Sequence, residues 1–233
     1  RNMTKARKVL NLDKILVATD LSPRAERAIA RAAHLADEHE ATLTVLHVLT
    51  EAVGDEARIR QVALKVEKDL RLKVKELSRR YEISVSIQVA TGSPFLEIIR
   101  RARGEEVDII LVGAHGAQFI KDLLVGTTAE KIARKGDRPV LVVKRSVRGP
   151  YRSVLVPTDF SEQSGQALEL AMRIAPRSKY YLLHAYQGIE GQLWRAGFAK
   201  SEILRYRRQI ARQSREQMKR LIRRMGLRGK SIV

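Results

Sequence analysis

The chain contains no cysteine, and its 233 residues include only 14 glycines, 6 prolines and 1 tryptophan. Without cysteine, disulfide bonds, thiol catalysis and cysteine-ligated zinc or iron–sulfur sites are excluded. A composition of 44% hydrophobic and 30% charged residues is typical of a globular protein with a core. Because a cysteine-free chain fits a reducing compartment, we expect a cytoplasmic protein.

Long apolar runs are also missing. No stretch approaches the roughly 20 apolar residues that a membrane-spanning helix needs. The basic residues 1–14 are not followed by the apolar core of a signal peptide, because the run Ile15–Ala18 is short and Asp20 interrupts it. We therefore expect neither a signal peptide nor a membrane span.

Acidic residues are far fewer than basic residues. Lys and Arg number 45 against 26 Asp and Glu, which gives a net charge of +19. From Pro150 onward the imbalance is sharper, with 17 basic against 6 acidic residues. Such an excess predicts an anionic partner, but it does not decide between a nucleotide, a nucleic acid, an acidic membrane surface and an acidic protein.

The strongest organisational feature is an internal repeat. Residues 14–22 (KILVATDLS) match residues 153–161 (SVLVPTDFS), and each stretch is an apolar run closed by Thr-Asp-x-Ser. In both copies an alanine-rich helical stretch, an apolar run with a histidine (His47 or His184) and a long basic amphipathic helix follow. The repeat predicts two units, residues 1–145 and 152–233, joined by a short Gly-Pro linker. The second unit is an incomplete copy that reaches only its third strand.

The first copy continues with an alternation of strands and helices. Strands are expected at 14–19, 42–48, 83–90, 107–112 and 139–143, and helices at 25–36, 59–81, 94–103 and 128–135. Such alternation predicts an α/β fold with an open parallel sheet and helices on both faces. The second copy predicts helices at 166–174 and 202–225, the latter inside a basic helical stretch from Arg195 to Arg228.

A glycine-containing loop follows the fourth expected strand. It reads Gly113-Ala114-His115-Gly116, then nine residues, then Gly126-Thr127. Glycines let a backbone approach a phosphate closely, and a helix N-terminus offers free N–H donors and partial positive charge. Thr127 and Glu130 have the spacing of a capping box, with Thr127 as N-cap. The alternative is a plain turn followed by an ordinary helix cap.

Asp20 stands at the end of the first expected strand. Ligands of open parallel sheets bind at the carboxyl ends of the strands, where the strand order reverses. If the first strand lies beside the fourth, Asp20 and the glycine loop flank one crevice, and the carboxylate can accept hydrogen bonds from a ribose or adenine. Asp20 could instead cap the following helix, although Ser22 competes for that role, and Val48 at the end of the second strand could be plain core.

Together these features resemble the universal stress protein family. The resemblance rests on Gly-x2-Gly-x9-Gly-Thr, the strand-one Asp20 with Ser22, Gly92-x-Pro94, and the final Pro-Val-Leu-Val-Val strand. It implies five parallel strands in the order 3-2-1-4-5 and an ATP site, with any Mg²⁺ or Mn²⁺ held by the phosphates. The residues that it implies for nucleotide binding are Asp20, Val48, Gly113, Gly116, Gly126, Thr127 and the neighbouring Thr128. The second unit has Ala185 where the first has Val48, and we predict no nucleotide binding there.

We therefore expect an ATP-binding regulatory protein of the stress response, with slow hydrolysis or none. No general base, metal-binding carboxylate pair or catalytic residue can be named, and the five histidines lack the spacing of metal ligands. One alternative is a basic interaction module with a vestigial nucleotide site, docking on nucleic acid or another anionic partner. Another is an adenylylating enzyme. For the long basic helix we favour a solvated outer face over nucleic-acid binding.

The last strand, Pro139–Val143, is expected at a sheet edge. Val140 to Val143 carry no charge that would repel a neighbouring strand, and Pro139 removes only the first N–H donor. We therefore predict a homodimer, or an intramolecular pseudo-dimer with a complete second unit, formed through this strand.

Overall fold

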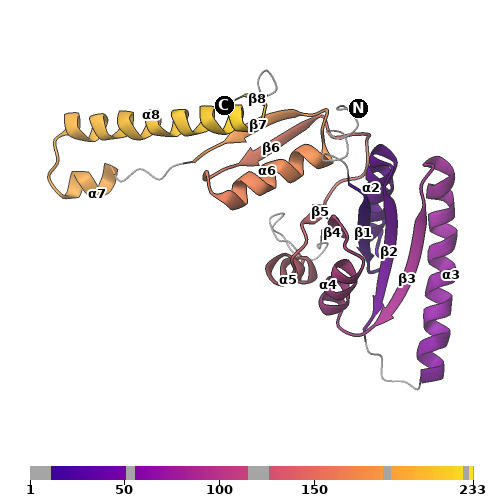
Figure 1. Cartoon of the computed structure of the whole chain (residues 1–233). Coiled ribbons are helices and arrows are strands. Elements are labelled where there is room, and N and C mark those ends of the chain that lie inside the picture. The colour runs from indigo at the N-terminus through magenta and orange to yellow at the C-terminus, as the bar shows by residue number, and fades with distance from the viewer. Residues whose placement is uncertain (1–11, 51–55, 115–125, 186–189, 228–230, 233) are drawn as a thin grey trace. The chain divides into compact units, whose positions relative to one another are not determined.

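The computed structural model describes residues 12–50, 56–114, 126–185, 190–227 and 231–232. The chain divides into two compact units, residues 1–150 and 151–233, and each is built on a sheet of its own (Figure 1). None of the helices within these described ranges is long and apolar enough to cross a membrane.

Strands and helices alternate along the first unit. They are β1 (Lys14–Thr19), α2 (Pro23–His39), β2 (Thr42–Leu49), α3 (Glu56–Arg80), β3 (Val85–Thr91), α4 (Pro94–Gly104), β4 (Ile109–Gly113), α5 (Thr127–Lys135) and β5 (Val140–Val143). All neighbouring strands are parallel, and their order is β3-β2-β1-β4-β5. The predicted α/β class and the order 3-2-1-4-5 are confirmed.

The centre of this sheet is buried on both faces, which explains why β1 and β4 are continuous apolar runs. On one face Leu16 and Leu46 pack with α4 and α5, through residues such as Ile98 and Ile132. On the other face lies α2, whose small alanines let the helix approach the strands closely. An ion pair between Glu26 of α2 and Lys73 of α3 joins the two helices of that layer.

The start of α2 settles which residue caps it. The Oγ of Ser22 accepts a hydrogen bond from the N–H of Ala25 at 3.2 Å, and Pro23 occupies the first helical position. Proline suits this position because its missing N–H would have no partner inside the helix. Asp20 therefore lies outside the helix, at the end of β1.

The start of α5 corrects the predicted capping box. The N-cap is Gly126 and not Thr127, because the carbonyl of Gly126 already accepts the first helical hydrogen bond, from the N–H of Glu130 at 2.9 Å. Thr127 is the first helical residue, so Glu130 is the fourth and cannot complete the box. Glycine has no side chain to accept a hydrogen bond, so the N-cap residue leaves the first-turn N–H groups of α5 uncapped.

The second unit is smaller. It contains β6 (Ser153–Pro157), α6 (Glu162–Ile174), β7 (Lys179–Leu183), α7 (Glu190–Arg195), α8 (Lys200–Arg224) and β8 (Ser231–Ile232). Its strands are parallel in the order β6-β7-β8. Helices α6 and α8 share one core with this sheet, made by Val156, Leu168, Tyr180, Leu182, Met218, Leu221 and Leu227.

The basic helical stretch predicted from Arg195 to Arg228 is broken. Gly197 has a φ of 83°, a left-handed conformation that ends the segment begun by α7 and favours glycine. The chain then restarts as α8, where the carboxylate of Glu202 accepts the N–H of Ala199 at 2.9 Å. Gly226, with a φ of 65°, follows the end of α8.

The face of the β6-β7-β8 sheet that does not pack against α6 and α8 differs from the corresponding face of the first unit's sheet. Leu155 is 63% exposed and Leu183 is 51% exposed. The positions that correspond to them in strand register are Leu16 and Leu46, which lie at 0% exposure beneath α4 and α5. The second unit therefore presents an apolar sheet face that the first unit covers with helices.

Candidate functional site

A cavity of about 580 Å³ opens at the carboxyl ends of β1, β2 and β4. Strand order reverses here, because β1 is followed along the chain by β2 on one side but pairs with β4 on the other. Ligands of open parallel sheets bind at such a switch point. The volume falls within the range of about 300–1,000 Å³ that is usual for small-molecule sites.

The cavity brings together most of the residues singled out in the sequence. Its wall includes Asp20, Val48, Gly113, Gly126 and Thr128. Thr127 is exposed at the start of α5 and is not among the described residues of the wall. Gly116 lies outside the described residues.

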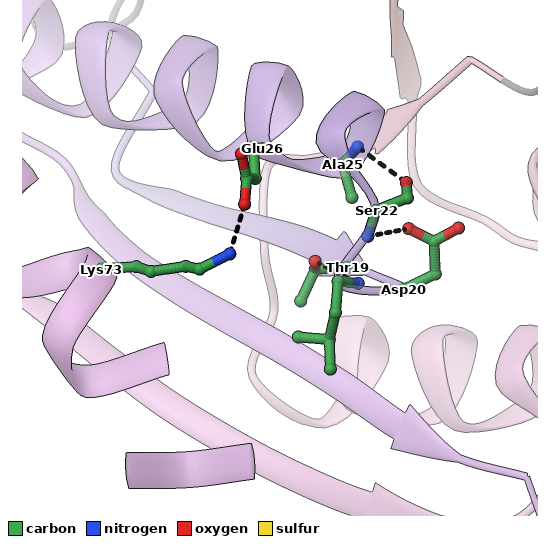
Figure 2. Close-up of polar contacts among 7 residues, drawn as sticks. Thr19, Asp20, Ser22, Ala25, Glu26 and Lys73 are labelled. Atoms are coloured by element: carbon green, nitrogen blue, oxygen red, sulfur yellow. Dashed lines mark hydrogen bonds and ion pairs between the residues drawn. The ribbon is translucent and has the colours of Figure 1, made fainter. Parts of the chain in front are cut away.

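The turn after β1 holds Asp20 through two local hydrogen bonds (Figure 2). The Oγ1 of Thr19 accepts the N–H of Leu21 at 3.0 Å, and the Oδ1 of Asp20 accepts the N–H of Ser22 at 3.0 Å. Leu21 has a φ of 65°, a conformation that costs a residue with a side chain about 1–2 kcal/mol. The turn therefore stores some strain while it positions the carboxylate at the cavity.

His47 supports this turn from β2. Its ring is buried, and Nδ1 lies 2.8 Å from the carbonyl oxygen of Thr19. Because a carbonyl oxygen only accepts hydrogen bonds, Nδ1 carries the proton and donates it. His47 thus ties β2 to the residue before Asp20.

Reasoning from the sequence missed Arg24. Together with Ser22 and Ala25, this half-buried arginine brings the first turn of α2 to the cavity wall. The N-termini of α2 and α5 therefore both reach the cavity, and each contributes partial positive charge and N–H donors. The only available signal was the position of Arg24 two residues after the Ser22 cap, and arginine is too common in this chain to stand out.

Gly113 has a steric role beside the phosphate contact that the sequence predicts. A Cβ at this position would lie 3.0 Å from backbone atoms of Arg24 and Ala25. The glycine therefore favours the close approach of β4 to the first turn of α2, where a Cβ would force its neighbours to shift. Gly113 shapes the cavity by bringing its two walls together.

The second unit repeats the turn in the same detail. The Oγ1 of Thr158 accepts the N–H of Phe160 at 3.0 Å, and the Oδ1 of Asp159 accepts the N–H of Ser161 at 3.0 Å. Phe160 has a φ of 65°, and the Nδ1 of His184 lies 2.7 Å from the oxygen of Thr158. Hydrogen bonds from the side chain and backbone of Ser161 lower the pKa of Asp159 to about 2.

Acidic side chains are scarce on the described part of the cavity wall. Across the described ranges, no group of three or more histidine or acidic side chains could hold a metal ion. Among the described residues of the wall, Asp20 is the one carboxylate and Arg24 the one guanidinium. The arrangement suits a ligand with a hydrogen-bond donor at one end and negative charge at the other.

Comparisons with known proteins agree with this fold. The sequence model of the universal stress protein family matches residues 11–144. Universal stress protein YxiE of Bacillus subtilis is 31% identical over 147 residues, which cover 57% of this chain and 99% of that protein. Universal stress protein UspA of Lactobacillus plantarum has a similar structure, with 24% identity, a TM-score of 0.51, and coverage of 57% of this chain and 99% of that one. A universal stress protein of Archaeoglobus fulgidus matches with 21% identity and a TM-score of 0.61, over 78% of this chain and 71% of that one.

Proposed function

Because this chain belongs to the universal stress protein family, we propose that its first unit binds an adenine nucleotide, ATP, as a regulatory ligand in a stress response. The observation that carries the proposal is the cavity at the strand ends, with a carboxylate on one wall and two helix N-termini on the others. Such a cavity matches a nucleoside at one end and phosphates at the other.

The adenosine end is assigned to Asp20 and Val48. Asp20 follows β1 and Val48 lies near the end of the neighbouring β2, so the two residues come from adjacent strands of one wall. The carboxylate accepts hydrogen bonds from a ribose hydroxyl or the adenine amino group. The backbone of Val48 pairs with the base. Charge-assisted hydrogen bonds of this kind are the strong ones, which makes Asp20 the main determinant of adenosine binding.

The phosphate end is assigned to the N-termini of α2 and α5. Gly126 and Thr128 bring the start of α5 to the wall, and Arg24 adds a full positive charge from α2. Gly116 and Thr127 complete the phosphate loop in this proposal. A Mg²⁺ or Mn²⁺ ion, where bound, is held by the phosphates, since the described residues supply no side-chain metal cluster.

Turnover is proposed to be slow or absent. Phosphoryl transfer needs a positioned nucleophile and charge compensation around the phosphates. The one carboxylate that the described wall supplies is Asp20, which the proposal places at the adenosine end. The nucleotide is then a bound signal whose presence changes how the protein interacts with partners.

Calorimetric titration of the full chain with ATP and with adenosine tests this assignment. ATP should bind with one site per chain, and adenosine should bind more weakly because it lacks the phosphates. Arg24→Gln should weaken ATP by about tenfold, the value of one charged hydrogen bond, while adenosine is almost unaffected. Equal losses of affinity for ATP and adenosine would show that Arg24 does not contact the phosphates. The absence of any heat of binding for ATP would contradict the proposal as a whole.

The second unit is proposed to be a partial copy of the first. The repeated turn, the parallel β6-β7-β8 order and the shared strand register support this reading. Ala185 stands where the first unit has Val48, so the nucleotide is assigned to the first unit alone. The edge strand β5 is proposed to pair with a second copy of the chain, or with the corresponding strand of a complete second unit.

A further inference from the structure

Helix α8 carries a line of positive charge along one side. The line consists of Arg205, Arg208, Arg212, Arg215, Lys219 and Arg223, all of them exposed. Successive members are three or four residues apart, so at 3.6 residues per turn they share one side of the helix. At a rise of 1.5 Å per residue, the line is about 27 Å long.

The opposite side of α8 is buried near both ends of the helix. Ile203, Met218 and Leu221 are the buried residues of the helix, and the last two belong to the core of the second unit. Their burial fixes the rotation of α8, so the line of cations faces solvent. Acidic side chains neutralise this line only in part. Among the described residues, the carboxylate paired with the line is that of Glu216, which lies 3.0 Å from Lys219.

The exposed side of a helix needs some charge, but a line of like charges destabilises the helix. Like charges three or four residues apart on a helix repel each other and destabilise it by a few tenths of a kcal/mol per pair. Solubility is better served by mixed charges, as on the exposed side of α3, where Arg71 pairs with Glu67. A linear polyanion lying along α8 would remove this repulsion.

An exposed aromatic ring stands near the beginning of α8. Trp194 in α7 is 65% exposed, and it lines a shallow hollow with Lys200, Ile203, Leu204 and Arg207 at the beginning of α8. Helix α7 packs against α8 (Figure 1), which fixes this hollow next to Lys200 and Arg207. An aromatic ring among cations is the arrangement on which unpaired bases stack.

We propose that α8 binds a single-stranded nucleic acid, with the phosphates along the line from Arg205 to Arg223 and a base stacked on Trp194. A membrane surface is the less suitable partner, because an amphipathic helix binds bilayers by inserting its apolar side. Near the end of α8, that side packs into the core of the second unit through Met218 and Leu221. The proposal is independent of the nucleotide cavity of the first unit.

The test is fluorescence anisotropy of a labelled 20-nucleotide single strand with the full chain across a series of salt concentrations. Six phosphate contacts predict a slope of log K against log salt of about −4. The triple variant Arg208→Gln, Arg212→Gln, Arg215→Gln keeps good helix formers in α8 and should weaken binding at least tenfold. Its slope should be less steep by about 2.

A matched control removes the same net charge from the other long helix. Arg60→Gln, Lys68→Gln and Lys75→Gln lie at exposed positions of α3 and should change affinity less than threefold. Circular dichroism verifies that both variants stay folded. An equal loss in the two variants would show that net charge alone attracts the strand, and it would overturn the proposal.

Two further measurements separate the partners. Trp194→Ala should weaken the single strand but not a duplex of the same length, and Trp194→Phe should restore most of the affinity. Because Trp194 is the single tryptophan of the chain, quenching of its fluorescence by the strand reports stacking directly. Equal binding of strand and duplex without any effect of Trp194→Ala would contradict the proposal. Tighter binding to vesicles of anionic lipid than to the strand would also contradict it.

Discussion

Asp20 and Asp159 occupy identical turns in the two units, yet we assign nucleotide binding to Asp20 alone. In each turn the Oδ1 of the aspartate accepts an N–H two residues later, and the intervening residue, Leu21 or Phe160, has a φ of 65°. The turn is therefore a local product of Thr-Asp-x-Ser. The turn alone therefore does not make a binding site. Nucleotide binding is assigned to Asp20 because its turn forms part of the cavity wall.

This difference gives a matched pair of variants. Asp20→Asn removes the charge but keeps the acceptor of the turn, so it should weaken ATP and adenosine by a similar factor, between a few-fold and a hundredfold. Asp159→Asn should leave both affinities unchanged. Calorimetric titration measures both. A loss confined to ATP would place Asp20 at the phosphates or at their metal ion instead.

The pKa of Asp159 tests whether its turn persists in solution. Hydrogen bonds from Ser161 lower this pKa from 3.8 to about 2, so they stabilise the folded state above pH 4, and that contribution is lost as the pH falls from about 4 to about 2. An NMR titration of the carboxyl carbon should show the low midpoint, and Ser161→Ala should raise it. An Asp159 midpoint near 3.8 in the unmodified protein would mean that the turn does not persist in solution.

At the scale of single residues, only part of the cavity wall could be predicted from the sequence. Asp20, Val48 and Gly126, which line the cavity, could be singled out because strand ends and glycine spacing are visible in the sequence. Arg24 was missed because one cation among 45 carries no signal until the fold brings it to the cavity. The steric role of Gly113 was missed because its neighbours, the backbone atoms of Arg24 and Ala25, are 88 residues or more away in the chain.

At the scale of helices and strands, uninterrupted apolar runs were the reliable signal. β1 and β4 are buried on both faces, so nearly every side chain must be apolar, and their positions could be predicted to within two residues. Helix ends were less predictable. Gly126 displaced Thr127 as the cap of α5, and Gly197, with its positive φ, divided the basic helical stretch. At both ends, several neighbouring residues could have served.

The two sheets provide a comparison of equivalent leucines. Leu16→Ala should lower the free energy of unfolding by about 2–5 kcal/mol, because Leu16 is fully buried beneath α4 and α5. Leu155→Ala, at the corresponding position of β6, should change it by less than about 0.5 kcal/mol, because its side chain is 63% exposed. Urea denaturation followed by circular dichroism gives both values. A large loss at Leu155 would show that another element covers this face in solution.

For the whole molecule, the edge of the first sheet is the feature with consequences for assembly. The carbonyls of Pro139 and Val143 accept N–H groups from the β4 side, so by alternation the N–H groups of Val140 and Val142 point away from the sheet. An exposed edge of apolar residues invites pairing. Val142 also packs against the core, so hydrogen exchange is a cleaner probe than a substitution there.

We expect light scattering to show a dimer, and the Val140 and Val142 amides to exchange slowly at high protein concentration. Dilution below the dissociation constant should make both amides exchange quickly, because their partners are lost. The amide of Val112 in the central strand β4 serves as the control and should stay protected throughout. A monomer with fast exchange at both edge amides at every concentration would contradict pairing through β5.

The central claim is that the cavity of the first unit holds ATP in one orientation. A crystal structure of the full chain grown with saturating ATP tests this claim most directly. The account predicts the adenosine beside Asp20 and Val48, and the phosphates at the N-termini of α2 and α5 within reach of Arg24 and Gly126. An empty cavity, or a nucleotide with its phosphates at Asp20, would contradict it.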